Sequence, residues 1–125
     1  MYESALAIQD YGDLGRSTAT PRGVEYEVFA RVTRDLTSAE GAGPFAAMAK
    51  ALTANLDLWT VLGVDVAGDG NTLPAELRSK IFYLFEFTRH HTARVMKGEA
   101  TAGVLIDINK AVMRGLRGSK EREVE

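Results

Sequence analysis

Apolar side chains recur every three or four residues along four long stretches of this chain, the spacing that places them on one face of an α-helix. The stretches cover residues 20–40, 44–67, 74–97 and 101–116, and glycine or proline separates each from the next. No stretch alternates apolar and polar residues as a half-buried strand would. The pattern therefore predicts an all-α fold, a small bundle of four main helices whose short connections make neighbours antiparallel.

Each predicted helix has one apolar stripe that should face the core. The two central helices should form a hairpin closed by the break at 68–71, with Trp59 packed near its closed end. The stripes are Val24, Val28, Phe29, Val32 and Leu36; Phe45, Met48, Leu52, Leu56 and Trp59; Leu77, Ile81, Leu84, Phe85 and Val95, with Thr88 and His91 in register; and Leu105, Ile108, Val112 and Leu116.

Capping residues mark where the helices should begin. Thr20 followed by Pro21 is typical of a helix start, because the hydroxyl can accept a free N–H and proline lacks one. Asn71 or Thr72 is expected to cap the third main helix, with Pro74 in its first turn.

The later helix ends have similar signals. Gly98 is expected to end the third helix in a left-handed conformation, after the basic residues Arg94 and Lys97. Thr101 is expected to cap the last helix.

The two ends of the chain have weaker patterns. Residues 2–8 could form a short helix, and residues 11–19, with two glycines, are expected to be a mobile linker. Residues 117–125 are mostly charged and are expected to be a disordered tail. We therefore expect a single helical domain over residues 1–116, followed by this tail.

Composition changes the picture mainly by exclusion. Apolar residues make up 46% of the 125 residues, and no apolar run approaches the roughly 20 residues that a membrane helix needs. The N-terminus has acidic residues and no basic region, so we expect no signal peptide there; the expected location is the cytoplasm, with which the absence of cysteine is compatible. Without cysteine there is no disulfide and no thiolate site.

The net charge of −2 is unevenly distributed along the chain. Residues 1–70 hold ten acidic and five basic side chains (−5), whereas 71–125 hold seven and ten (+3). The predicted helix over 74–97 is the basic one, with Arg78, Lys80, Arg89, Arg94 and Lys97. Such a run is usually a solvated face, but it could also meet an acidic partner or RNA phosphates.

The break between the central helices can be aligned with a calcium-binding EF-hand loop. Asp65, Asp69, Asn71 and Glu76 then fall at ligand positions, but Ala67 offers no side-chain oxygen at the third position. A glycine-rich turn is the better interpretation, and we predict neither calcium nor any cofactor.

Candidate catalytic residues do not stand out. The adjacent His90 and His91 point about 100° apart on a helix and cannot share a metal; a surface hydrogen bond from His90 to Glu86 is the better interpretation. Nucleophile-elbow and phosphate-binding motifs are also missing from the sequence, which argues against an enzyme.

Two asparagines are more informative, because Asn55 and Asn109 each interrupt or border an apolar stripe. A buried asparagine needs hydrogen-bond partners. The expected role of each is a core hydrogen bond to a loop backbone.

Four segments, in order, carry a resemblance to a known family. They are TPRGVEYEVFARVTRDL (20–36), ALTANLDLW (51–59), GNTLPAELRSKIFYL (70–84) and VLIDINKAVMRGL (104–116), preceded by an early tyrosine. The pair N-x-x-L-W and N-x-L-P-x-x-L-R is specific. The chain resembles FlaF, the small flagellar biosynthesis regulator of α-proteobacteria. Thr20, Pro21, Asn55, Asn71, Pro74 and Arg78 are the motif positions for which we expect a structural role.

This resemblance implies a non-enzymatic cytoplasmic protein that binds flagellin as a secretion chaperone and regulates flagellin synthesis. It also implies a second partner, an FlbT-like regulator of flagellin mRNA. A client helix would need an apolar groove. The residues that could line such a groove, rather than the core, are Trp59, Leu62, Leu73, Leu77, Ile81 and Phe85.

Two alternatives to a chaperone stay open at this point. The protein could act on translation without chaperoning, through the FlbT-like regulator or flagellin mRNA, although few aromatic residues accompany the basic ones to stack on bases. It could also be an inert homodimer of helix pairs. The sequence does not fix the oligomeric state.

Overall fold

The computed structural model describes the backbone of residues 20–124 and the side chains of residues 26–41 and 43–115. Within this range the fold is all-α, as predicted. The helices are α2 (Thr20–Ala42), α3 (Phe45–Ala67), α4 (Ala75–Met96) and α5 (Gly103–Val124). The bounds of α2, α3 and α4 agree with the sequence prediction to within about two residues. The predicted helix over 2–8 and the linker over 11–19 lie outside the described residues.

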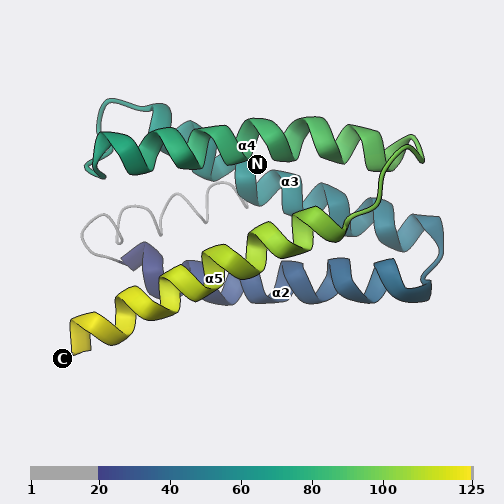
Figure 1. Cartoon of the computed structure of the whole chain (residues 1–125), viewed down its shortest axis with the longest axis horizontal. Helices are drawn as coiled ribbons and strands as arrows, with labels where there is room; N and C mark the ends of the chain where they lie inside the picture. The colour runs from purple at the N-terminus through teal and green to yellow at the C-terminus, as the bar shows by residue number, and fades with distance from the viewer. Residues whose placement is uncertain (1–19, 125) are drawn as a thin grey trace.

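Successive helices run antiparallel, so the connections between them alternate between the two ends of the bundle (Figure 1). The α2–α3 and α4–α5 connections lie at one end, and the 68–74 loop lies at the other. The extensive interfaces among the described residues join α2 with α3, α3 with α4, and α2 with α5. Because α4 has only one extensive helical neighbour, one flank of α4 is left open.

The core lies between α2, α3 and the first half of α5, and the stripes predicted from the sequence supply much of it. Phe29 meets Trp59 edge-to-face with ring centroids 5.7 Å apart. Such an aromatic pair adds about 0.5–1.5 kcal/mol beyond its area burial. The buried apolar residues of the core cluster are Phe29, Val32, Leu36, Ala39, Ala51, Leu52, Leu58, Trp59, Val95, Ala102, Leu105 and Ile106.

Two residues of the predicted stripes are exposed instead of buried. Phe45 is 63% exposed and Leu77 is 42% exposed. Phe45 is the first residue of α3 and Leu77 lies in the first turn of α4, so both are at ends of the bundle. Periodicity predicts which side of a helix faces inward, but it does not show where along the helix the neighbouring helix ends.

Gly98 ends α4 as predicted. Its φ is 77°, and its N–H donates to the carbonyl of Val95, while the N–H of Glu99 donates to the carbonyl of Arg94 at 2.9 Å. These two bonds form a Schellman motif, which satisfies carbonyls that the helix end would leave free.

The predicted N-caps of α4 and α5 were wrong. Pro74, not Asn71 or Thr72, precedes α4, and it makes no side-chain cap. Ala102, not Thr101, directly precedes α5, and its N–H donates to Oε1 of Glu40 (3.3 Å). Both helices begin later than a cap at the predicted residues requires. The Thr20 side chain, the predicted cap of α2, lies outside the described side chains.

Helix α5 continues beyond the point predicted from its apolar stripe. The sequence predicted a disordered tail after Leu116, whereas the backbone is helical to Val124. The segment contains no proline, and its arginine, lysine and glutamate residues are good helix formers. Low hydrophobicity argues against burial of this segment but does not prevent it from continuing a helix that already exists.

Candidate partner-binding surface

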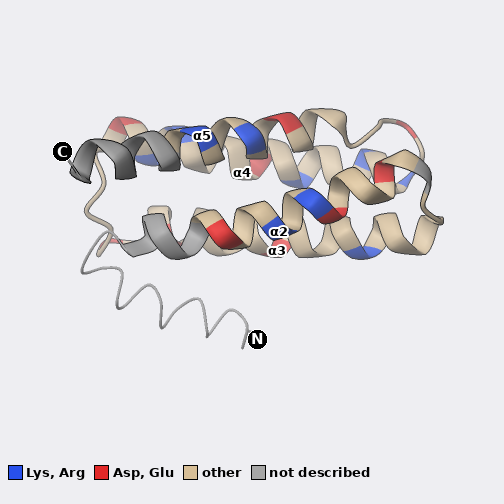
Figure 2. Ribbon diagram, turned by 90° about the horizontal axis from the view of Figure 1, so that it is seen from below, with Lys and Arg blue, Asp and Glu red and all other residues tan. Residues whose placement is uncertain are grey.

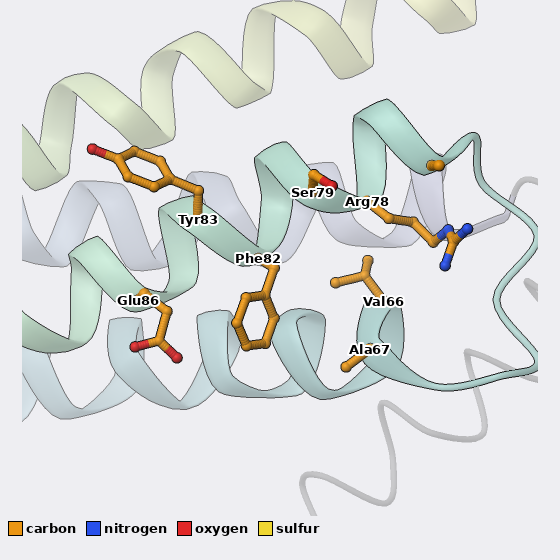
Figure 3. A pocket seen from close by; sticks show the side chains of 8 residues that line it. Val66, Ala67, Arg78, Ser79, Phe82, Tyr83 and Glu86 are labelled. Carbon is orange, nitrogen blue, oxygen red and sulfur yellow. The ribbon is translucent and has the colours of Figure 1, made fainter.

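An open groove of about 590 Å³ lies between the C-terminal end of α3 and the N-terminal half of α4 (Figure 3). We call it the α3–α4 groove. Figure 3 shows Phe82 extending from α4 toward α3, near the side chains of Val66 and Ala67, whereas Tyr83 points the other way. The lining residues are Val66, Ala67, Ala75, Arg78, Ser79, Phe82, Tyr83 and Glu86. The groove therefore combines apolar residues with polar and charged ones.

The two aromatic residues of the groove are accessible. Tyr83 is 66% exposed and Phe82 is 39% exposed. Phe82 also packs edge-to-face against Phe85, with ring centroids 5.6 Å apart and an interplanar angle of 65°. Because Phe85 lies partly inside the bundle, this contact anchors the Phe82 ring while leaving part of it open to solvent.

The close packing of Phe85 against α3 depends on a glycine in that helix, Gly63. A Cβ atom placed on Gly63 would lie 2.5 Å from Cδ2 of Phe85, closer than any real contact allows. Gly63 is itself buried. The missing side chain lets α4 approach α3 closely, and this approach sets the depth at which Phe85, and hence Phe82, sits.

The 68–74 loop is braced by polar side chains. Nδ2 of Asn71 donates to Oδ2 of Asp65 (2.9 Å), and Oδ1 of Asn71 accepts the N–H of Leu73 (3.0 Å). Nε of Arg78 donates to the carbonyl of Leu73 (2.9 Å). The N-x-L-P-x-x-L-R segment thus has a structural basis: its asparagine and arginine fix the loop from both sides, and Pro74 directly precedes α4.

The 68–74 loop is part of the segment that can be aligned with a calcium-binding EF-hand loop. The side chains of Asp65 and Asn71, both at ligand positions of that alignment, hydrogen bond to each other. No group of three or more His, Cys, Asp or Glu side chains with metal-binding geometry occurs among the described residues.

Asn55 and Asn109 do not bond loop backbone, contrary to the prediction. Both are completely buried, and Nδ2 of Asn109 donates to Oδ1 of Asn55 (2.8 Å). Nε1 of Trp59 donates to Oδ1 of Asn109 (3.0 Å). The three side chains form one chain of hydrogen bonds, which we call the Asn–Asn–Trp chain, linking α3 to α5.

Trp59 is therefore a core residue and does not line a surface groove. It is 1% exposed, and it contacts Phe29 of α2 and Asn109 of α5. The prediction that it packs near the closed end of the α3–α4 hairpin missed these neighbours. An apolar stripe identifies a buried residue, but it does not identify which of several helices will cover it.

The other predicted groove residues divide into two groups. Leu62, Ile81 and Phe85 are half-buried and pack against the core. Leu73 and Leu77 are exposed at the loop end of the bundle. These two are the residues of the predicted set that the structure presents to a partner without rearrangement.

Sequence reasoning missed Phe82 and Tyr83, the exposed aromatic residues of the groove. They fall outside the stripe formed by Ile81, Leu84 and Phe85, so they were not assigned to the core or to a site. The available signal was two adjacent aromatic residues on the polar side of an amphipathic helix. Adjacent exposed aromatic residues of this kind can mark an interaction site.

The basic residues of α4 are partly engaged. Arg78 binds the carbonyl of Leu73, and Nη2 of Arg94 donates to the carbonyl of Glu99 (3.3 Å). Arg89 pairs with Glu86, so the predicted Glu86–His90 hydrogen bond is replaced by this ion pair. Figure 2 shows acidic and basic residues interspersed along the helices in that view, without one large basic patch.

The second histidine, His91 of α4, hydrogen bonds to the connection between α4 and α5. Nε2 of His91 donates to the carbonyl of Thr101 (2.8 Å), and its ring stacks on Phe87 with centroids 5.4 Å apart. Because a carbonyl can only accept, this bond places a proton on Nε2. His91 thereby ties the start of α5 to α4.

Fold and surface together define a small helical-bundle protein with a preformed, partly apolar groove on its outer helix. No helix in the described range is long and apolar enough to cross a membrane. The sequence pattern of the family described as "Flagellar protein FlaF" matches residues 7–116. This chain belongs to the FlaF family. No curated protein and no solved structure matches it.

Proposed function

We propose that this flagellar protein binds flagellin in the cytoplasm, acting as a secretion chaperone and a regulator of flagellin synthesis, and that it is not an enzyme. Membership of the FlaF family supports a role in the flagellum. The observation that carries the binding role is the α3–α4 groove, with Phe82 and Tyr83 accessible on a helix that has one free flank.

The groove has the chemistry to receive an amphipathic helix. Apolar side chains of a client would cover Phe82 and Tyr83, while Arg78, Ser79 and Glu86 could bind polar groups along the edge. Aromatic residues that a partner covers fully are frequent hot spots, at which truncation to alanine costs about 2 kcal/mol or more of binding free energy. Leu73 and Leu77 extend the accessible apolar surface at the loop end.

Isothermal titration of the protein with flagellin, at low and high salt, tests this proposal. Burial of apolar groups predicts a negative heat-capacity change and an affinity that changes little with salt. Because apolar burial can have almost no enthalpy near 25 °C, the titration is repeated at two or more temperatures, and an absence of heat at every temperature and both salt concentrations would contradict flagellin binding. Trp59 fluorescence is not a direct probe, because the indole is buried behind α2 and α5 and does not line the groove.

The alternative is regulation without chaperoning, through an FlbT-like regulator or flagellin mRNA. Lys80, Arg89 and Lys97 give α4 and its C-terminal end exposed positive charge. Binding to RNA phosphates would weaken steeply with salt, about tenfold or more between 50 and 200 mM for several contacts. The same titration with flagellin mRNA separates the two functions. The ion pair of Arg89 and the mixed charge of the surface favour the chaperone.

A further inference from the structure

The polar side chains buried in the described part of the bundle share one region. Every helix contributes at least one of them, although the core around them is apolar. They are Thr33 of α2, Asn55 of α3, Thr88 and Thr92 of α4, and Asn109 of α5.

Contacts between the helices place three of these residues at the same height in the bundle. Phe29 of α2 meets Trp59 of α3, so in this antiparallel pair Thr33, four residues later, lies level with Asn55, four residues earlier. Asn55 bonds Asn109 directly.

The remaining two residues lie close to this level. Gly63 of α3 meets Phe85 of α4. Seven residues after Phe85 in α4 stands Thr92, and seven residues before Gly63 in α3 stands Leu56. Because the two helices are antiparallel, Thr92 lies level with Leu56, the neighbour of Asn55. Thr88 lies one turn nearer the 68–74 loop. The five side chains therefore lie within about one helical turn of the same height on the four described helices, and we call this level the polar layer.

Hydrogen bonding within the layer is uneven. The Asn–Asn–Trp chain supplies two buried, directed bonds between α3 and α5. Nδ2 of Asn55 and the hydroxyls of Thr33, Thr88 and Thr92 have no partner. A layer containing four unpaired buried groups is a poor way to stabilise a core, since apolar residues of the same shape would avoid the desolvation penalty.

The apolar pattern on its own leaves the register of α5 ambiguous. Leu105 and Val112 are seven residues apart, as are Ile106 and Met113, so a two-turn slip of α5 would again place apolar residues on the core side. The same holds in α3, where Leu52 and Trp59 are seven apart. Such a slip would move α5 by about 10 Å along its axis.

The buried positions at this end of the chain are Ala102, Leu105, Ile106 and Asn109, and a slip that brings Asn109, Val112, Met113 and Leu116 to them changes polarity only where Asn109 leaves and where it arrives. Seven residues before and after Asn109 stand Ala102 and Leu116, and seven before and after Asn55 stand Met48 and Leu62, all apolar. In a slipped register Asn55 and Asn109 would each face apolar groups without a partner. A single buried asparagine pair can specify register in this way at a cost in stability.

We propose that the Asn–Asn–Trp chain is a register lock: it fixes the position of α5 on α3, and it lowers the stability of the bundle in doing so. This proposal is independent of flagellin binding. It predicts that removing the whole chain keeps the protein folded but releases the register.

Double electron–electron resonance between two spin labels can measure the register directly. Because the chain has no cysteine, two introduced cysteines would be the only sites labelled. Cysteines replace the exposed Lys50 of α3 and Arg114 of α5. With the native core we expect one narrow distance peak. With Asn55→Leu, Asn109→Leu and Trp59→Phe together we expect a broad or double peak, with a second population displaced by about 5–10 Å.

A matched control removes polar groups of the layer that make no directed bond. Thr88→Val and Thr92→Val together keep shape and delete two unpaired hydroxyls. This variant should keep the single native peak.

The triple variant should melt within about 5 °C of the native protein or higher. A single native peak in the triple variant overturns the proposal.

A second triple variant uses alanine in place of leucine, because two added leucines could overpack the core. It combines Asn55→Ala, Asn109→Ala and Trp59→Phe in the same labelled protein. If circular dichroism shows that both triple variants are unfolded, the chain contributes net stability and the register-lock proposal is overturned. If either triple variant folds, its distance distribution decides.

Discussion

Asn109 bonds Asn55 across the centre of the bundle, Nδ2 to Oδ1 at 2.8 Å, although the two residues are 54 positions apart in the chain. Asn109 also accepts the indole N–H of Trp59. Most of the broad packing of α5 is against α2, so these polar contacts are what tie it to α3. The hydrogen-bonded contact between α5 and α3 therefore depends on the side chain of Asn109.

Replacing Asn109 with alanine should destabilise the protein strongly. The change leaves Nε1 of Trp59 and Oδ1 of Asn55 buried without partners, at about 1–3 kcal/mol for each group. We expect a loss of about 2–5 kcal/mol in the free energy of unfolding, measured by urea denaturation. Asn71→Ala, which removes a loop asparagine outside the core, should cost less than about 1 kcal/mol. Equal losses in the two variants would contradict this account.

Replacing Gly63 with alanine should also destabilise the protein, although alanine is the better helix former. The added Cβ would collide with the ring of Phe85 at 2.5 Å, and overpacking of this kind costs about 1–3 kcal/mol. The comparison is Gly70→Ala in the loop, where a Cβ meets nothing within 4 Å and the change should be nearly neutral. Thermal melting of both variants provides the measurement. A stabilised Gly63→Ala protein would show that α4 can move away from α3 freely.

Replacing Gly98 with alanine should weaken the end of α4 without any steric clash. Nothing lies within 4 Å of a Cβ at this position, but φ is 77°, a conformation that costs an L-residue about 1 kcal/mol. The Gly98→Asn variant should lose less stability than Gly98→Ala, because asparagine tolerates the left-handed region better than alanine. Urea denaturation of the two variants tests this. Identical stabilities would mean that the Schellman motif is not retained.

Replacing Phe82 with alanine should weaken flagellin binding if the α3–α4 groove receives the client. Loss of an aromatic anchor corresponds to about a 10- to 100-fold rise in Kd. The matched control is Phe45→Ala, which should leave Kd unchanged, because Phe45 is exposed at the start of α3, the end of that helix farthest from the 68–74 loop. Titration calorimetry on both variants, after circular dichroism confirms their fold, gives the answer. Equal effects would place the client elsewhere.

Local patterns accounted for much of this fold. The spacing of Val32 and Leu36 and of Leu52 and Trp59 predicted which sides of α2 and α3 are buried, because a helix places residues three or four apart on one face. Gly98 was predicted as a left-handed terminator because few other residues tolerate that conformation. These are properties of a few neighbouring residues, and a sequence displays them directly.

The candidate site was predicted only in part. Leu73 and Leu77 are exposed as a groove would require, but Trp59 is core, and Phe82 and Tyr83 were not identified. Exposure depends on where neighbouring helices end and which helices pack together. Those are relations between residues far apart in the chain, and the apolar stripe of a single helix carries no information about them.

The sequence by itself determined the helices, most of their ends, the buried side of each and the FlaF family. Only the tertiary structure decided that Asn55 and Asn109 bond each other and that Phe82 stays accessible in the α3–α4 groove. The physical reason is range: helix formation and capping are governed by contacts within about four residues, whereas partner choice among helices depends on side chains that meet only after the chain has folded.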